Sequence, residues 1–485
     1  MNEEHHFYAH STQPKFRAAR RSQRNVAKPR PVITVLAFVF GVYGGADVGI
    51  EGASLPNLLG GCLGLLLLAI HVRRLPSSFL YGIAALCTLY LLSGINAVAQ
   101  FELPLVSLAP TGMLLYSLLG VAGIILDLSL WKRRDIQKLG LYGAVIILAG
   151  CLIEISTPLK DATRDFANFL IGLSGHIAEW DSTGDRDLIL FGAARPTLFT
   201  SETSLVAIGY TVFVSIWFLA KRSMDQMSIG LLVIMTLVAL AWTRSPFPLF
   251  ALAIFCLSRV VPRRDSAEKL RYSTWALALL FAVPSIYIFF TTFNSIFASR
   301  ISTISSGGDW STTMRTYGAI LVGWEAALER PFFGYGPGNI DLFESTMKDV
   351  YARFGVPWVV LDADYFRTTL NNGLGASLAY FGLVGFATYI LLLTYILQTI
   401  SPMSRWPFLF GLIILICFFS GSIYTYRYIN PLLLLAFVGG SVFRHDDRSE
   451  ILNSNTRRSA HAFENKLPVR SGQSRAPGNS QSGSS

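Results

Sequence analysis

The sequence of 485 residues is 52% hydrophobic and only 14% charged, and its net charge at pH 7 is +10. Soluble globular proteins carry roughly a quarter charged residues, so this composition excludes an ordinary soluble protein and indicates a protein of the lipid bilayer. The positive charge does not indicate nucleic-acid binding, because the lysine and arginine residues lie beside apolar runs and in the two tails. The five cysteines all fall within apolar runs and predict neither disulfides nor a metal site.

Twelve apolar stretches are long enough to span a bilayer as helices, each of which needs about twenty residues. They lie at residues 31–47, 55–72, 79–98, 109–130, 139–157, 203–220, 227–243, 246–261, 274–293, 373–398, 406–423 and 429–443. The basic segment 1–30 precedes them without a cleavable signal, and the serine- and glycine-rich segment 444–485 is expected to be disordered. We therefore predict an all-α integral membrane protein with about 12 transmembrane helices.

The basic residues of the short connections predict the orientation of these helices. Clusters of lysine and arginine follow the second, fourth, sixth and eighth spans, so the positive-inside rule places these connections and both tails in the cytoplasm. Nine spans then lie within residues 31–293, with an external loop at 158–202, and three lie within 373–443. The largest external loop, 294–372, separates helices 9 and 10. This frame depends on a short break between the seventh and eighth spans, at Trp242–Pro248.

Three arginines are candidates for function. Arg244 lies between two apolar stretches at the predicted outer membrane edge, where an unpaired cation is costly. A simpler alternative is that its side chain extends to the interface. Arg300 and Arg315 flank the polar linker Ser305–Asp309 at the start of the large loop, where arginines are usually solvated.

Further along the large loop, an amphipathic stretch ends at Pro331 and leads into a glycine-rich turn with Gly334, Gly336 and Gly338. Glycines at this density allow a close approach of the backbone to a ligand. A tight external turn without a ligand is the alternative interpretation.

Among the acidic residues, Glu202 precedes the sixth span, and Asp362 and Asp364 precede the tenth. Glu202 can equally be a carboxylate that favours the start of a helix. His176, in the external loop 158–202, is interpreted as a surface residue. No cluster of histidines and carboxylates suggests a metal, so we expect neither a metal nor another cofactor.

Five segments in a fixed order resemble the superfamily of Wzy-type polysaccharide polymerases and O-antigen ligases, over roughly residues 195–395. Arg195–Ser204 looks like the segment of exopolysaccharide polymerases that runs from an arginine to the motif Glu-Pro-Ser. The other four are Thr243–Ser245, the loop arginines Arg300 and Arg315, the turn Pro331–Gly338 and the stretch Leu370–Gly385.

This resemblance implies a glycosyltransferase of the bacterial inner membrane that polymerises undecaprenyl-diphosphate-linked repeat units at the periplasmic face. The external loops are then periplasmic, and chain-length regulator and export proteins are further expected partners. The implied catalytic residues are Arg244, Arg315 and Arg300 at the diphosphate, with Glu202, Asp364 or Asp362 as a base. The implied substrate-binding residues are Arg195, Gly334, Gly336, Gly338, Asn371 and Asn372.

One departure from the family pattern concerns the base. Asn371 and Asn372 stand where many members carry a His-Asn pair, and an amide cannot accept a proton from a hydroxyl at neutral pH. Three alternatives stay open: an O-antigen ligase that transfers the glycan to lipid A core, a twelve-helix transporter or flippase, and a structural scaffold. The charge at span ends and the large external loop favour an external active site over a transport pathway.

The topology makes a direct prediction for Ser306, in the loop 294–372. A cysteine introduced there should react with a membrane-impermeant maleimide in intact spheroplasts, because that loop is predicted to be external. A cysteine at Ser223, in the predicted cytoplasmic connection after the sixth span, should react only after lysis. Protection of Ser306→Cys until lysis would reverse the predicted orientation.

Overall fold

The computed structural model describes residues 29–39, 49–50, 53–54, 58–72, 77–157, 161–163, 165, 195–198, 203–221, 225–245, 247–249, 314, 317–356, 370 and 372–400. All of them belong to the first of two compact units, Met1–Val442. The second unit, Phe443–Ser485, and the predicted spans 274–293, 406–423 and 429–443 lie outside the described residues.

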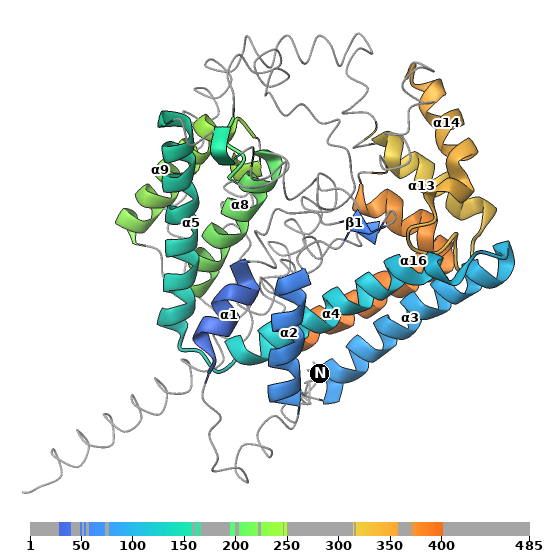
Figure 1. Cartoon of the computed structure of the whole chain (residues 1–485), viewed down its shortest axis with the longest axis horizontal. Helices are drawn as coiled ribbons and strands as arrows, with labels where there is room; N and C mark the ends of the chain where they lie inside the picture. Colours follow the sequence, from blue (N-terminus) through green and yellow to red (C-terminus); the bar gives the residue numbers. More distant parts are fainter. Residues whose placement is uncertain are drawn as a thin grey trace, which may run out of the picture. The chain divides into compact units, whose positions relative to one another are not determined.

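The described residues are mainly helical (Figure 1). The α-helices are α1 (Pro31–Phe38), α2 (Leu58–His71), α3 (Ser77–Phe101), α4 (Ala109–Leu128), α5 (Arg133–Ser156), α8 (Thr203–Ala220), α9 (Gln226–Thr243), α13 (Tyr317–Glu329), α14 (Glu344–Arg353) and α16 (Gly373–Ile400). Two 3-10 helices, η3 (Leu105–Leu108) and η4 (Ile340–Phe343), precede α4 and α14. Two short strands, β1 (Gly49–Ile50) and β2 (Ala53–Ser54), pair antiparallel.

Five helices in the described part of the chain are long and apolar enough to cross a membrane. They are Ser77–Phe101, Leu105–Leu128, Arg133–Ser156, Gln226–Thr243 and Gly373–Thr399, and α2 and α8 contribute shorter apolar helices. The prediction of a mainly helical chain with several helices able to span a membrane is therefore confirmed for the described residues, while the total of twelve spans stays a prediction. The large loop also contains the ordered helices α13 and α14.

Helices α1, α2 and α4 form one packed group, in which glycines let α2 and α4 approach each other closely. A Cβ atom on Gly123 would lie 1.9 Å from the carbonyl oxygen of Gly64, and one on Gly64 would lie 2.4 Å from that of Gly120. Small residues are typical of helix contacts in membranes, where packing replaces the hydrophobic effect as the source of association.

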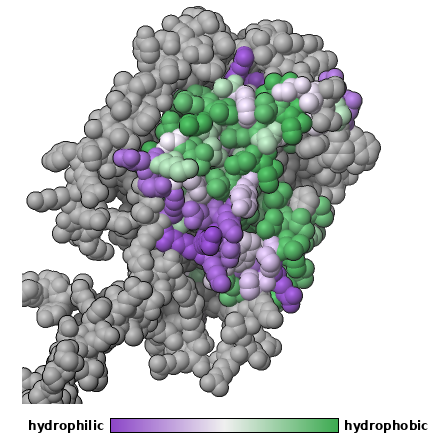
Figure 2. Space-filling model, turned by 90° about the vertical axis from the view of Figure 1, so that its left-hand side faces the viewer, coloured by the Kyte–Doolittle hydropathy of each residue, from purple (hydrophilic) through white to green (hydrophobic). Residues whose placement is uncertain are grey.

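Helices α5, α8 and α9 form a second packed group. Gly140 and Gly143 of α5 lie against Phe213 and Trp217 of α8. Figure 2 shows a continuous apolar area beside a hydrophilic one on the face that α5 and α9 present. Exposed apolar side chains on these two helices include Tyr142, Val145, Ile146, Leu152, Ile153, Leu231 and Ile234. Such a surface suits contact with lipid rather than with water.

The contact between α2 and α4 can be tested by adding one methyl group. Gly123→Ala should lower the thermal unfolding temperature of the detergent-purified protein, because its Cβ would overlap the Gly64 carbonyl and overpacking costs about 1–3 kcal/mol. Gly112 lies on the same helix with no atom within 4 Å of an added Cβ, so Gly112→Ala should cause no decrease. Equal unfolding temperatures for both variants would contradict this account of the packing.

Candidate functional site

The glycine turn, Arg330–Gly338, binds a break in α16 through the backbone. Gly382 has φ 67° and ψ −179°, so α16 is interrupted there and the groups on both sides lose their helical partners. Four hydrogen bonds replace them: Tyr335 N to Ala379 O (2.9 Å), Gly336 N to Tyr380 O (3.1 Å), Val384 N to Pro331 O (2.8 Å) and Gly385 N to Phe332 O (3.0 Å). The turn thus satisfies both freed carbonyls and freed N–H groups of the break.

Helix α3 holds this junction from a third side. The hydroxyl of Ser93 lies within hydrogen-bonding distance of two carbonyl oxygens, that of Tyr380 (2.8 Å) and that of Phe333 (3.0 Å). Ser93 is buried, and no water is needed to satisfy its hydroxyl. The junction therefore unites α3, the large loop and α16.

The three glycines of the turn all have positive φ, at 62°, 76° and 88° for Gly334, Gly336 and Gly338. A Cβ on Gly334 would lie 2.4 Å from Ala379 O of α16, and one on Gly336 would lie 2.6 Å from the Cβ of Ala97 in α3. A Cβ on Gly338 would lie 2.3 Å from the ring of Pro110 in α4. The close approach that these glycines allow is thus an approach to three helices, and a ligand role for them stays a prediction.

Side chains around the turn form a polar group that the sequence analysis did not single out. Tyr335 stacks on Phe101 with ring centroids 5.7 Å apart, and its hydroxyl donates a hydrogen bond to Glu329. The hydroxyl of Thr346 also donates to Glu329, at 2.8 Å. Burial and, secondarily, the neighbouring Glu329 raise the pKa of Tyr335 to about 12. Tyr335 is therefore a neutral donor at physiological pH, and its phenol cannot serve as a base there.

Arg195 is the first residue of a short segment that is hydrogen-bonded to the buried Glu154. The carboxylate of Glu154, at the end of α5, accepts hydrogen bonds from Thr197 N (3.1 Å), Thr197 Oγ1 (3.2 Å) and Leu198 N (2.8 Å). Leu198 has a φ of 43°, unusual for a residue other than glycine. In the sequence, Glu154 is marked only as a single acidic residue near the end of the apolar run 139–157.

Arg244 ends α9 in a left-handed conformation. Its φ and ψ are 47° and 33°, and its N–H donates to Leu240 O at 2.8 Å. A left-handed residue other than glycine costs about 1–2 kcal/mol, and such strain concentrates at functional sites. The predicted break between the seventh and eighth spans agrees with this helix end, and residues 247–249 are helical again. The strain keeps Arg244 a candidate for function.

Asn372 has a structural role at the start of α16. Its side-chain oxygen accepts hydrogen bonds from Leu374 N and Gly375 N, both at 3.1 Å, which is the N-cap arrangement. Several predicted site residues lie outside the described residues, so their positions and their roles stay predictions. They are Glu202, Arg300, Arg315, Asp362, Asp364 and Asn371, together with His176.

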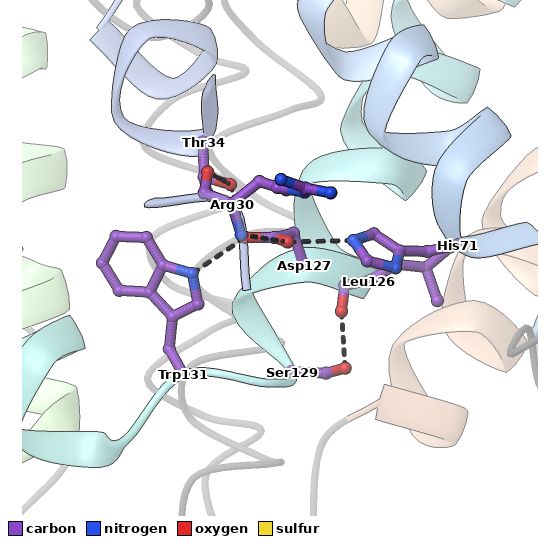
Figure 3. A network of polar contacts seen from close by, with 7 residues as sticks. All are labelled: Arg30, Thr34, His71, Leu126, Asp127, Ser129 and Trp131. Atoms are coloured by element: carbon purple, nitrogen blue, oxygen red, sulfur yellow. Dashed lines mark hydrogen bonds and ion pairs between the residues drawn. The ribbon is translucent and has the colours of Figure 1, made fainter. Parts of the chain in front are cut away.

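A separate buried cluster surrounds Asp127 at the end of α4 (Figure 3). Its carboxylate accepts hydrogen bonds from the Arg30 backbone N–H (2.9 Å), the Thr34 hydroxyl (2.5 Å) and the Trp131 indole (2.9 Å), and it lies 2.9 Å from Nε2 of His71. Both Asp127 and His71 are buried. The cluster connects α1, α2 and α4. In the sequence, its only sign is that Asp127 is an acidic residue within the apolar run 109–130.

Among the residues that the structure describes, no group of three or more histidines, cysteines, aspartates or glutamates is arranged to hold a metal ion. Comparisons of the chain with protein-family models, curated proteins and solved structures gave no match. The function must therefore be argued from the residues and their geometry.

The junction at Gly382 can be tested by hydrogen exchange. Gly382→Ala should accelerate amide exchange in the peptide that contains Tyr335 and Gly336, because the new Cβ would lie 2.3 Å from Arg330 O and the backbone conformation is accessible almost only to glycine. Gly230→Ala in α9, where an added Cβ meets no atom within 4 Å, is the matched control. Unchanged exchange in Gly382→Ala would show that the turn does not depend on the break.

Proposed function

We propose that this protein is a membrane glycosyltransferase that polymerises undecaprenyl-diphosphate-linked repeat units at the periplasmic face of the inner membrane. The observation that carries the proposal is the junction between the turn Pro331–Gly338 and the helix break within Leu370–Gly385. These two segments resemble separate elements of the polymerase superfamily. Four backbone hydrogen bonds join the two segments, which supports the proposal that both belong to one site.

The junction attaches the large loop to a helix that is apolar enough to span the membrane. A diphosphate at the head of a lipid carrier lies at the membrane surface, so residues of a loop held there can reach it. The first free N–H groups of α16 offer little to a phosphate, because the Asn372 oxygen already binds those of Leu374 and Gly375. We therefore assign binding of the diphosphate to arginines, because a planar guanidinium group donates paired hydrogen bonds to phosphate oxygens.

In the proposed reaction, a sugar hydroxyl of one lipid-linked unit attacks the anomeric carbon of a chain carried on another lipid. A new carbon–oxygen bond forms, the bond to the diphosphate breaks, and the hydroxyl proton passes to a base. Arg244 and Arg315, assisted by Arg300, stabilise the charge that develops on the leaving diphosphate. Glu202 is the preferred base, followed by Asp364 and Asp362.

The broken helix α16 also raises the transporter alternative, because discontinuous helices form substrate sites in many transporters. In those sites the free backbone groups bind the substrate or an ion. Here the carbonyls of Ala379 and Tyr380 accept hydrogen bonds from the glycine turn instead. The buried Asp127 likewise has donors from its own chain around it. The first observation indicates a structural role for the break in α16 and the second a structural role for Asp127, which favours the glycosyltransferase over a transporter.

The proposal is tested by complementation of a strain that lacks the gene. The deletion should leave single repeat units in place of polymer on gels of surface and secreted polysaccharide, and the wild-type gene should restore polymer. Arg244→Lys should restore at least about tenfold less polymer, because a hydrogen bond to a charged group contributes about 1.5–3 kcal/mol and lysine lacks the paired donors.

Arg353→Lys is the matched control for this test. Arg353 is an exposed arginine of α14 whose two terminal nitrogens bind Glu325 at 2.7 and 2.8 Å, so its replacement should leave polymer unchanged. Full-length polymer that accumulates on the carrier lipid after deletion would instead indicate a ligase. Intact polymer in the deletion strain would refute both enzymes.

A further inference from the structure

The outer side of α13 and the glycine turn carries a row of exposed apolar side chains, which we call the aromatic edge. It consists of Trp324, Leu328, Phe332 and Phe333, which are 47%, 53%, 65% and 38% exposed. Trp324 and Leu328 are four residues apart and so lie on one face of α13. The edge continues from this face into the turn. A soluble loop rarely keeps four large apolar side chains exposed in such a short segment.

The opposite face of α13 is packed against α16, so the aromatic edge faces away from that contact. Ala319, Val322, Gly323 and Ala326 are buried there. A Cβ on Gly323 would lie 2.1 Å from Gly375 O, which shows that the two backbones touch. Contacts between small residues of this kind are typical of helix pairs within membranes.

The lengths of three helices give the depth of the turn relative to the bilayer. At 1.5 Å per residue, Ser93 lies about 24 Å from the start of α3 at Ser77. By the same measure, Pro110 lies about 27 Å from the end of α4 at Leu128. Gly382 lies about 27 Å from the end of α16 at Ile400.

These three residues all contact the turn. The ends of α3 and α4 used for the measurement lie beside basic clusters in the sequence, and the single basic residue Arg405 follows the end of α16. The hydrocarbon core of a bilayer is about 30 Å thick. Three separate helices thus place the turn at the far boundary of the hydrocarbon core from those basic ends.

We propose that the aromatic edge contacts phospholipid at this boundary, so that the middle of the large loop is anchored in the bilayer and is not suspended in water. Phe332 and Phe333 lie at the level of the acyl chains. Trp324, two helical turns before the glycine turn, lies at the level of the headgroups, where tryptophan is enriched. The exposed Arg330, whose guanidinium lies 4.9 Å from the centre of the Phe101 ring, faces the headgroup phosphates from the same turn.

Continuity with the lipid-facing surface of α16 supports this assignment over contact with another protein. Phe332 O accepts its hydrogen bond from Gly385 N, immediately after the exposed Val384. Val384 belongs to a candidate membrane span, so the apolar surface of that span and the aromatic edge adjoin. A bilayer that covers Val384 also covers Phe332.

Photocrosslinking tests the proposal without any assay of enzyme activity. Benzoylphenylalanine is incorporated singly at the positions of Phe332, Tyr142 and Asp349, and membranes that contain the full-length protein are irradiated. Tyr142 is exposed on the candidate span α5 and is the lipid-facing control, whereas Asp349 is exposed on the hydrophilic helix α14 and is the aqueous control. The purified proteins are then compared by intact-mass spectrometry.

Phe332 and Tyr142 should both gain the mass of one phospholipid, and Asp349 should not. A Phe332 position without a lipid adduct, while Tyr142 forms one, would overturn the proposal, as would a crosslinked dimer that shows a second copy against this edge. Phe333 is the second probe site if the variant at Phe332 is not recovered. Because the readout is a lipid adduct, the result is independent of whether the protein polymerises sugars.

Discussion

A backbone N–H or C=O group inside a bilayer has no water to bind, so a break in a membrane helix is stable only where protein groups replace the lost partners. The break of α16 at Gly382 meets this constraint through the glycine turn, which accepts from two N–H groups and donates to two carbonyls. The position of the large loop follows from this exchange. Helix α13 is held against α16, and α14 packs on α13, because the turn is the partner that the broken helix requires.

The same constraint explains why glycine occurs at so many of the contacts. A backbone can bind another backbone only at short range, and a side chain on Gly334 or Gly382 would occupy the space of the opposing carbonyl. Gly323 and Gly375 extend the close contact along α13 and α16. The glycines of the junction and its backbone hydrogen bonds thus have the same cause, which is the close approach of two backbones.

Apolar runs predicted the helices well because hydropathy reports burial in lipid directly. The predicted span 79–98 lies within α3, and the predicted span 227–243 nearly coincides with α9. The predicted span 139–157 begins six residues late, since α5 starts at Arg133 among polar residues that hydropathy cannot assign to a helix. Helices outside the hydrocarbon core, such as α14, carry no apolar run at all.

The candidate site was less accessible to such reasoning, for two physical reasons. The glycines show where a backbone can approach closely but not which segment it binds, so the glycine turn could be recognised as a turn but not as the partner of α16. Single acids within apolar runs, such as Glu154 and Asp127, are revealed as important only when their donors are seen, and those donors come from distant segments. Arg244 was singled out as a candidate because a single arginine between two apolar runs is conspicuous in sequence.

The cluster around Asp127 bears on how the chain enters the membrane. Its members come from the start of α1, the end of α2, the end of α4 and the connection that follows. During synthesis, His71 and the first turn of α1 are therefore inserted before the carboxylate that binds them has been made. The packing of α1 and α2 that this cluster provides is therefore complete only once α4 and Trp131 have been made.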